Sequence, residues 1–175
     1  AQGLLAVVAT EEATGSEALA AALEGARLVA VLTQAQDPGN AGTIIRAADA
    51  AGADAVVLVR GSVDPTAPKV VRSTAGSLFH LPVVTGVALD DAVTALHNAG
   101  LTVLAADGRG DFDLFEAESL LGAPSAWLLG NEAHGLPLEA LSRADAVVSI
   151  PIYGKAESLN VAAAAAVCLY ASARA

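Results

Sequence analysis

The chain has 175 residues, a formal net charge of -10 at pH 7, 54% hydrophobic residues and only 3% aromatic residues. This length favours one domain with a sizeable core, and the hydrophobic content excludes intrinsic disorder. The single cysteine excludes a disulfide scaffold, and the acidic balance excludes a strongly basic nucleic-acid binder as a description of the whole chain.

Short apolar runs alternate with alanine-rich segments along the chain. The predicted strands are Leu4–Ala9, Arg27–Thr33, Ala55–Val59, Leu101–Ala105, Ala126–Leu129 and Ala146–Ile150. The predicted helices are Ser16–Glu24, Ala41–Ala51, Leu89–Ala99, Leu136–Leu141 and Ser158–Ala173. Loops are expected at Gly61–Val71 and Asp107–Glu118. Alternation of this kind predicts a single α/β domain over residues 1–175, with a parallel sheet and helices on both of its faces.

Several classes of protein lack their usual signals here. The longest apolar run, Val161–Ala171, is shorter than the roughly 20 residues that span a membrane, and no signal peptide is visible, so a cytoplasmic protein is expected. The three histidines and Cys168 show no metal-ligand spacing, which predicts no metal site. No P-loop motif occurs, and Gly108-Arg109-Gly110 is only a fragment of a dinucleotide motif.

The first unusual loop follows the second predicted strand and leads into a helix. It reads Asp37-Pro38-Gly39-Asn40-Ala41-Gly42, and Asn40 is expected to cap the helix. Arg46 falls at the edge of the apolar stripe of that helix. It is either a functional residue or the partner of Asp49 in an ordinary surface ion pair.

The second unusual loop follows the strand that ends at Leu129. Gly130 and Gly135 permit close approach of the backbone to a ligand. Glu132 is a candidate functional carboxylate or simply an acidic residue near a helix start, and His134 is expected to be a turn residue.

The third unusual loop runs from Ile150 to Val161, after the last predicted strand. Ser158 is expected to cap the final helix, which is a sufficient structural reason for a serine there. Asn160 is placed just inside the first turn, where it is a poor helix former with no local structural reason. Asn160 is therefore the stronger functional candidate of the two.

Together the three segments closely resemble the SpoU/TrmH family of RNA ribose 2′-O-methyltransferases, within the SPOUT superfamily. The matching pieces are Asn40-Ala41-Gly42 with Arg46, Gly130-Asn131-Glu132 with Gly135, and Ile150-Pro151 with Ser158-Leu159-Asn160-Val161. Three motifs in order, each after a predicted strand, make the resemblance specific, and it extends over roughly Leu28 to Tyr170.

The resemblance implies a C-terminal part tied as a deep trefoil knot, with S-adenosylmethionine held in the knotted loops. It implies a homodimer with the site near the interface. The implied cofactor-binding residues are Ala106, Asp107, Leu129, Gly130, Asn131, Ile150, Pro151 and Leu159. The implied catalytic residues are Asn40, Arg46, Glu132, Ser158 and Asn160.

The implied reaction is methyl transfer to a ribose hydroxyl of structured RNA, with 23S rRNA slightly favoured over tRNA. The alternatives are a cofactor- or RNA-binding module without turnover, and a flavodoxin-like binder of small molecules. Arginine is an implausible base because its guanidinium stays protonated far above neutral pH, so Arg46 is expected to clamp a phosphate and, with Asn40, to orient the nucleotide. Ser158 and Asn160 are expected to hold the ribose, and Glu132 to organise Arg46 or the loops.

The acidity must be reconciled with an RNA substrate. Residues 1–26 contain four acidic residues and no basic one, and Asp107–Glu118 contains five acidic residues against Arg109. The rest of the chain is nearly balanced, so a small basic patch near the site is expected. Its members would be Arg46, Arg60, Lys69, Arg72 and Lys155. Relatives of this kind often carry a preceding RNA-binding domain, and such a domain is expected to precede the strand and helix predicted in residues 1–26.

Overall fold

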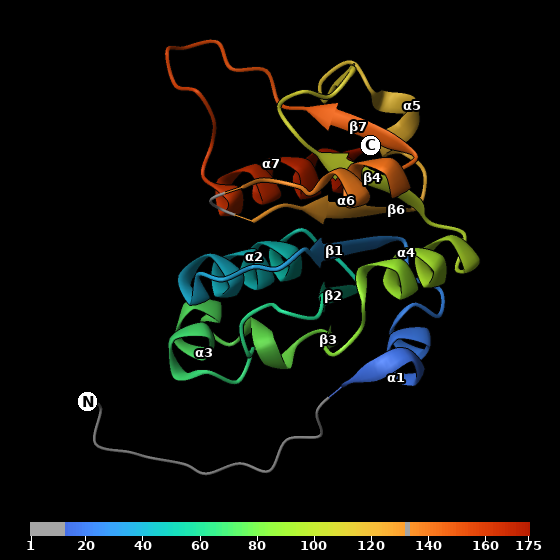
Figure 1. The fold of residues 1–175 in the computed structure, drawn as a ribbon, viewed down its shortest axis with the longest axis vertical. Helices are drawn as coiled ribbons and strands as arrows, with labels where there is room; N and C mark the ends of the chain where they lie inside the picture. Colours follow the sequence, from blue (N-terminus) through green and yellow to red (C-terminus); the bar gives the residue numbers. More distant parts are fainter. Residues whose placement is uncertain (1–12, 132–133) are drawn as a thin grey trace.

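The computed structural model describes residues 13–131 and 134–175. Its strands form one parallel sheet in the order β3-β2-β1-β6-β4-β7-β5 (Figure 1). The strands are β1 Leu28–Leu32, β2 Ala55–Leu58, β3 Val83–Val84, β4 Thr102–Ala106, β5 Phe112–Asp113, β6 Ser125–Leu129 and β7 Ala146–Ser149. Every residue of β1, β2 and β6 is buried, which explains why these strands are continuous apolar runs in the sequence.

Helices cover both faces of this sheet, as predicted (Figure 1). They are α1 Gly15–Ala22, α2 Pro38–Ala50, α3 Pro68–Thr74, α4 Leu89–Asn98, α5 Glu118–Leu121, α6 Leu138–Arg143, α7 Val161–Arg174 and the 3₁₀ turn η1 Ser77–Phe79. Alternate residues of β1 point to opposite faces: Leu28, Ala30 and Leu32 pack with α2, α3 and α7, whereas Val29 and Val31 pack with α1, α4 and α6.

Some predicted elements differ from the structure. The expected loop Gly61–Val71 is wrong at its end, because Pro68 begins α3; proline is well suited to the first position of a helix. The expected loop Asp107–Glu118 contains β5, and β3 was not predicted either. The predicted strand Leu4–Ala9 lies outside the described residues. The knot stays a prediction.

The order of the strands determines which loops can form a site. The strands β1, β6, β4 and β7 are neighbours and run in the same direction, so their carboxyl ends meet at one edge of the sheet. Ligands of open α/β sheets bind at such an edge. The three unusual loops all begin there. Within the described residues, no helix combines the length and apolar character needed to cross a membrane.

Cys168 lies on α7 and is fully buried, and this burial raises the pKa of its thiol to about 12. The reactive species of a cysteine is the thiolate, which is almost absent at pH 8 when the pKa is that high. We expect the native protein not to react with a thiol reagent such as Ellman's reagent at pH 8, and to release one equivalent of chromophore in denaturant. Rapid stoichiometric reaction of the native protein would contradict the burial of Cys168.

Candidate active site

The first site segment is the start of α2, and Asp37 rather than Asn40 caps it. The Asp37 Oδ1 atom accepts a hydrogen bond of 2.8 Å from the backbone N–H of Asn40, and Pro38 is the first helical residue. The expectation that Asn40 caps the helix is therefore wrong. The bond from the Asn40 N–H lowers the pKa of Asp37, with a further contribution from the Lys69 ammonium at 3.7 Å. An Asp-Pro pair before a helix is the signal that would have identified this cap.

The third site segment ends at the start of α7, where Asn160 is the cap. Its Oδ1 atom accepts hydrogen bonds from the N–H groups of Ala162 at 2.9 Å and Ala163 at 3.4 Å. The helix begins at Val161, so the expectation that Ser158 caps it is wrong. The expectation that Asn160 has no local structural reason is wrong for the same cause. Ser158 instead lies in the exposed loop before the helix.

A hydrogen bond joins these two helix starts. The Asn160 Nδ2 group donates to Asn40 Oδ1 at 3.1 Å, across 120 positions of the sequence. The amide of Asn160 therefore serves two helices, because its oxygen caps α7 while its nitrogen reaches α2. Figure 1 shows the starts of α2 and α7 on the same side of the molecule. The structure thus brings together two of the predicted catalytic residues.

Two substitutions separate the two roles of Asn160. Asn160→Asp keeps an oxygen that can cap α7 but loses the donor to Asn40, so we expect nearly unchanged thermal stability and reduced activity. Asn160→Ala loses both contacts and is expected to cost about 1 kcal/mol of stability as well, the usual value of a helix cap. Thermal unfolding measures the stability of each variant, and methyl transfer to RNA, the reaction that the resemblance implies, is assayed beside it. Ser158→Ala is the control for capping, and a loss of stability there would contradict the assignment of the cap.

The second site segment, the loop after β6, is fixed to the loop after β1. The carbonyl oxygen of Leu129 accepts hydrogen bonds from both the N–H and the Oγ1 of Thr33, each at 2.9 Å. The Asn131 Nδ2 group donates to the carbonyl of Gln34 at 2.9 Å. Leu129 and Asn131 therefore position this loop, and Thr33 is a positioning residue that the sequence analysis did not find.

The same loop folds tightly on itself. Asn131 and Gly135 exchange backbone hydrogen bonds of 3.0 and 2.8 Å. A Cβ atom on Gly130 would lie 2.5 Å from the carbonyl carbon of Gly135, so only glycine fits at this position. His134 is an exposed turn residue, as expected. Glu132, the predicted carboxylate, lies outside the described residues.

Arg46 lies on α2, on an exposed part of its surface. Its expected alternative partner, Asp49, instead contacts His80 with a distance of 2.7 Å between Asp49 Oδ2 and the Nδ1 atom of the ring. Hydrogen bonds from Ser77 and His80 lower the pKa of Asp49. None of the ion pairs among the described residues includes Arg46. The guanidinium can therefore bind a ligand without first losing an ion pair with another described residue.

The loops after β4 and β7 form the rest of the candidate site at the carboxyl edge of the sheet. Ala106, Ile150 and Pro151 are partly buried there. Asp107 is held by Arg109, which donates from Nε and a terminal nitrogen at 2.8 and 3.0 Å, and these bonds lower the pKa of Asp107. Arg109 is a further residue that the sequence analysis missed, although its position two residues after Asp107 is a signal for such a pair.

The loops after β4 and β6 lie against each other, because Asp107 Oδ2 is 3.9 Å from where a Cβ of Gly135 would be. From β7 the chain continues through an exposed loop, in which Leu159 is 41% exposed. This edge therefore combines small and apolar residues, backbone polar groups and one oriented carboxylate. Such a set of groups fits an adenosine-containing ligand, which needs apolar surface for its base and polar groups for its ribose.

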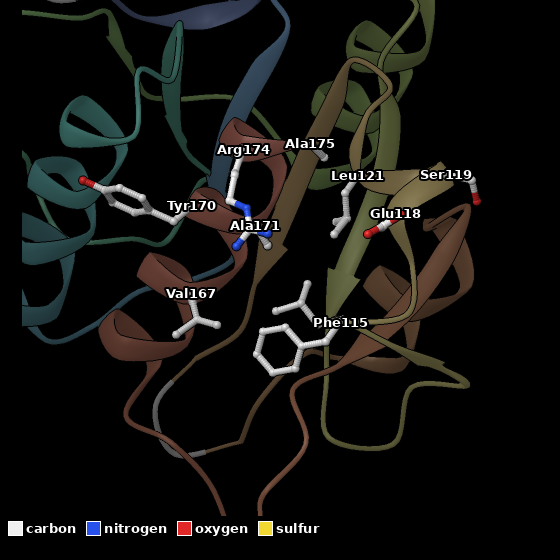
Figure 2. Close-up of a pocket in the computed structure, with 10 residues that line it drawn as sticks. Phe115, Glu118, Ser119, Leu121, Val167, Tyr170, Ala171, Arg174 and Ala175 are labelled. Atoms are coloured by element: carbon white, nitrogen blue, oxygen red, sulfur yellow. The ribbon is translucent and has the colours of Figure 1, made fainter.

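Two other features bear on the site. Among the described residues, no group of three or more His, Cys, Asp or Glu side chains could hold a metal ion. A cavity of about 1040 Å³ lies between α5 and α7, where Figure 2 shows Phe115 and Val167 in its lining. Its lining contains none of the described residues that were predicted for the site. The cavity and the candidate active site are therefore separate parts of the molecule.

Comparison with known proteins decides the family. Residues 27–170 match the SpoU rRNA Methylase family. The chain belongs to the SpoU rRNA methylase family. This membership confirms the resemblance carried by the three loop motifs, and it agrees with the parallel sheet covered by helices on both faces.

Relatives of this SpoU chain include RNA methyltransferases of bacteria. It is 42% identical over 151 residues to 23S rRNA (guanosine(2553)-2′-O)-methyltransferase RlmP of Bacillus subtilis strain 168, covering 85% of this chain and 58% of RlmP. It is 32% identical over 174 residues to 23S rRNA (guanosine-2′-O-)-methyltransferase RlmB of a Burkholderia species, covering 99% of this chain and 70% of RlmB. The chain thus spans little more than half the length of RlmP.

A solved structure shows the same fold with a cofactor. The SpoU methyltransferase AviRb from Streptomyces viridochromogenes, in complex with the cofactor AdoMet, superposes on this SpoU chain with a TM-score of 0.76. The two sequences are 38% identical, and the match covers 83% of this chain and 59% of AviRb. The α/β architecture predicted from the sequence is therefore confirmed.

Proposed function

We propose that this chain transfers a methyl group from S-adenosylmethionine to a ribose 2′-hydroxyl of structured RNA, with 23S rRNA as the favoured substrate over tRNA. The observation that carries the proposal is the Asn40–Asn160 hydrogen bond, which joins the first and third motifs beside the loops of β4, β6 and β7. The relatives named above as 23S rRNA methyltransferases support the substrate class. Such a substrate implies work in the cytoplasm.

The cofactor would be held at the carboxyl ends of β6, β4 and β7. Backbone groups of Gly130, Ile150 and Leu159 would hold the adenosine part, with Ala106 and Asp107 closing the pocket. The complex of AviRb with AdoMet supports the identity of the cofactor. When bound, S-adenosylmethionine supplies an electrophilic methyl group on a sulfonium.

The protein would act mainly by orientation and electrostatics. A ribose hydroxyl is a poor nucleophile, so it must be aligned with the methyl group and must lose its proton. We assign Arg46 to a phosphate of the acceptor nucleotide, because its guanidinium is always charged and offers a fork of donors. Asn40, Ser158 and Asn160 would hold the nucleotide and its ribose. Glu132 would organise Arg46 or the loops.

Transfer of labelled methyl groups tests this proposal. The protein, labelled S-adenosylmethionine and unmodified transcripts of 23S rRNA or tRNA are combined, and ribose methylation is mapped by mass spectrometry. We expect incorporation at a 2′-hydroxyl of the 23S transcript. Binding of cofactor without any transfer would favour the alternative of a module without turnover. Binding of flavin in preference to S-adenosylmethionine would favour the flavodoxin-like alternative.

We also propose that the chain works as a homodimer with the site near the interface. Exposed apolar side chains near the site support this, because Tyr153 in the loop after β7 is 87% exposed and Leu159 follows it. Light scattering on the purified protein measures its mass in solution. A monomer at micromolar concentration would contradict the proposal.

The affinity of this chain alone for RNA should be weak. Its net charge of -10 opposes binding to a polyanion, and the basic residues near the site form only a small patch. We expect dissociation constants for 23S rRNA transcripts at physiological salt to lie in the micromolar range typical of non-specific binding. Tight binding that weakens steeply with salt would contradict this expectation.

A further inference from the structure

A segment with basic residues and an exposed aromatic ring follows the first motif. Lys69 and Arg72 belong to the small basic patch expected from the sequence, but Phe79 has no role in the site described above. Residues 65–89 contain Lys69, Arg72 and His80 but no acidic residue, in a chain whose net charge is -10. This segment contains α3, η1 and β3, and Phe79 at the end of η1 is 68% exposed. Phe79 is thus one of the few aromatic residues of this aromatic-poor chain, and it is exposed within a segment that contains no acidic residue.

The turn between α3 and η1 determines the position of Phe79. Ala75 and Gly76 both have left-handed backbone angles, with φ of 50° and 103°, and they reverse the chain at the end of α3. The N–H of Phe79 then donates to the carbonyl of Gly76 at 3.0 Å, and the His80 ring is held by Asp49 of α2. The backbone that carries the exposed ring is therefore tied down on both sides.

This surface adjoins the helix that carries Arg46. On α2, Gly42, Arg46 and Asp49 are neighbours in one row, since residues three and four apart share a helix face. Gly42 packs against α3, where an added Cβ would lie 2.5 Å from the Cβ of Ser73, and Asp49 contacts His80 of the next turn. Arg46 is thus placed between the contacts of α2 with α3 and those with η1.

The nearby carboxylates contact Lys69 and His80 rather than an arginine. Asp37 is paired with Lys69 at 3.7 Å, and Asp49 is paired with His80 at 2.7 Å. Arg46 and Arg72 form none of the ion pairs among the described residues. Both guanidinium groups belong to exposed residues, Arg46 on α2 and Arg72 on α3.

We propose that Phe79 is a stacking platform for an unpaired base of the substrate RNA, and that Arg72 holds a neighbouring phosphate. The inference rests on the proposed function and extends it from the reacting nucleotide to its flank. Aromatic rings bind splayed bases through their faces, and exposed cations beside the ring bind the backbone. Single-stranded RNA next to the acceptor supplies both a base for the ring and a phosphate for the guanidinium.

Paired RNA probes isolate the stacking contribution. The wild-type protein and Phe79→Leu are titrated, by fluorescence polarisation at low salt, with a short oligoadenylate and with an abasic oligonucleotide of equal length and charge. We expect Phe79→Leu to bind the oligoadenylate about tenfold more weakly, the usual scale of one stacked base, with unchanged binding of the abasic probe. Phe79→Trp should restore the preference for bases. Leu138→Ala on α6 is the matched control, because Leu138 is also apolar and 78% exposed but lies on the opposite face of the sheet.

Salt dependence tests the role of Arg72. Arg72→Gln should reduce the slope of log affinity against log salt by about one, whereas Phe79→Leu should leave the slope unchanged. Equal affinity of wild type and Phe79→Leu for both probes would overturn the inference, as would a change of oligomeric state in Phe79→Leu seen by light scattering. Calorimetry with S-adenosylmethionine and the methylation assay are run in parallel. Intact cofactor binding and methyl transfer with no effect of Phe79→Leu would defeat this inference and leave the proposed function standing.

Discussion

Arg46→Ala should abolish methyl transfer to RNA while leaving the affinity for S-adenosylmethionine nearly unchanged. The side chain is exposed on α2, whereas the cofactor is proposed to be held by the loops after β4, β6 and β7. Alanine is a good helix former and no ion pair among the described residues is lost, so α2 should persist. Removing one preorganised electrostatic group typically lowers a rate by about 100- to 1000-fold.

Single-turnover methylation and calorimetry with the cofactor measure the two quantities. Arg27→Ala is the matched control, because Arg27 is also exposed but precedes β1 at the opposite edge of the sheet. Arg46→Lys should recover only part of the rate, since an ammonium keeps the charge but loses the planar fork that fits a phosphate. Loss of cofactor affinity in Arg46→Ala would show that this division of roles is wrong.

The second large effect is expected for Gly130→Ala, which should lose cofactor binding and some stability. The added Cβ would lie 2.5 Å from the carbonyl carbon of Gly135 and 2.6 Å from the nitrogen of Leu136. Both are backbone atoms, so no side chain can rotate away. Overpacking of this kind costs about 1–3 kcal/mol, and the loop must shift at the place where the adenosine would be held.

Thermal unfolding and cofactor calorimetry measure these effects. Gly108→Ala is the matched control, because it lies in the neighbouring loop after β4 and an added Cβ there would have nothing within 4 Å. We expect the control to keep both stability and cofactor binding. If Gly130→Ala bound the cofactor as well as the control does, the loop after β6 would not be part of the cofactor site.

The sequence predicted the sheet well where strands are long and buried. The strands β1, β2, β4, β6 and β7 are continuous apolar runs, and each was found within one or two residues. The strands β3 and β5 have two residues each, which is too short to show a periodic pattern. They are strands because they pair with β2 and β7, respectively. Their presence depends on tertiary structure, which local sequence patterns do not contain.

The site, too, could be predicted from the sequence only in part. The motif residues could be selected from the sequence, and parallel strands bring their loops to one edge. The capping residues were predicted wrongly: Asn40 and Ser158 were expected, but Asp37 and Asn160 cap the two helices. Asp, Asn and Ser are all good caps, so only the residue at which each helix begins decides between them. Links such as Thr33 to Leu129 connect residues 96 positions apart and have no signal in a single sequence.

The position of α7 has a consequence for biosynthesis. This helix is the last element of the described chain, yet it contacts α2, β1, β4 and β6, and it supplies Ala162, Ala165, Cys168 and Leu169 to the core. The chain emerges from the ribosome in order from its amino end, so before α7 appears one face of the central strands is covered only in part, by α2 and α3. The hydrophobic core on this face cannot be completed until α7 has left the exit tunnel. The hydrogen bond between Asn40 and Asn160 cannot form before then either. A chain terminated before α7 would therefore lack these core residues and the Asn40–Asn160 hydrogen bond.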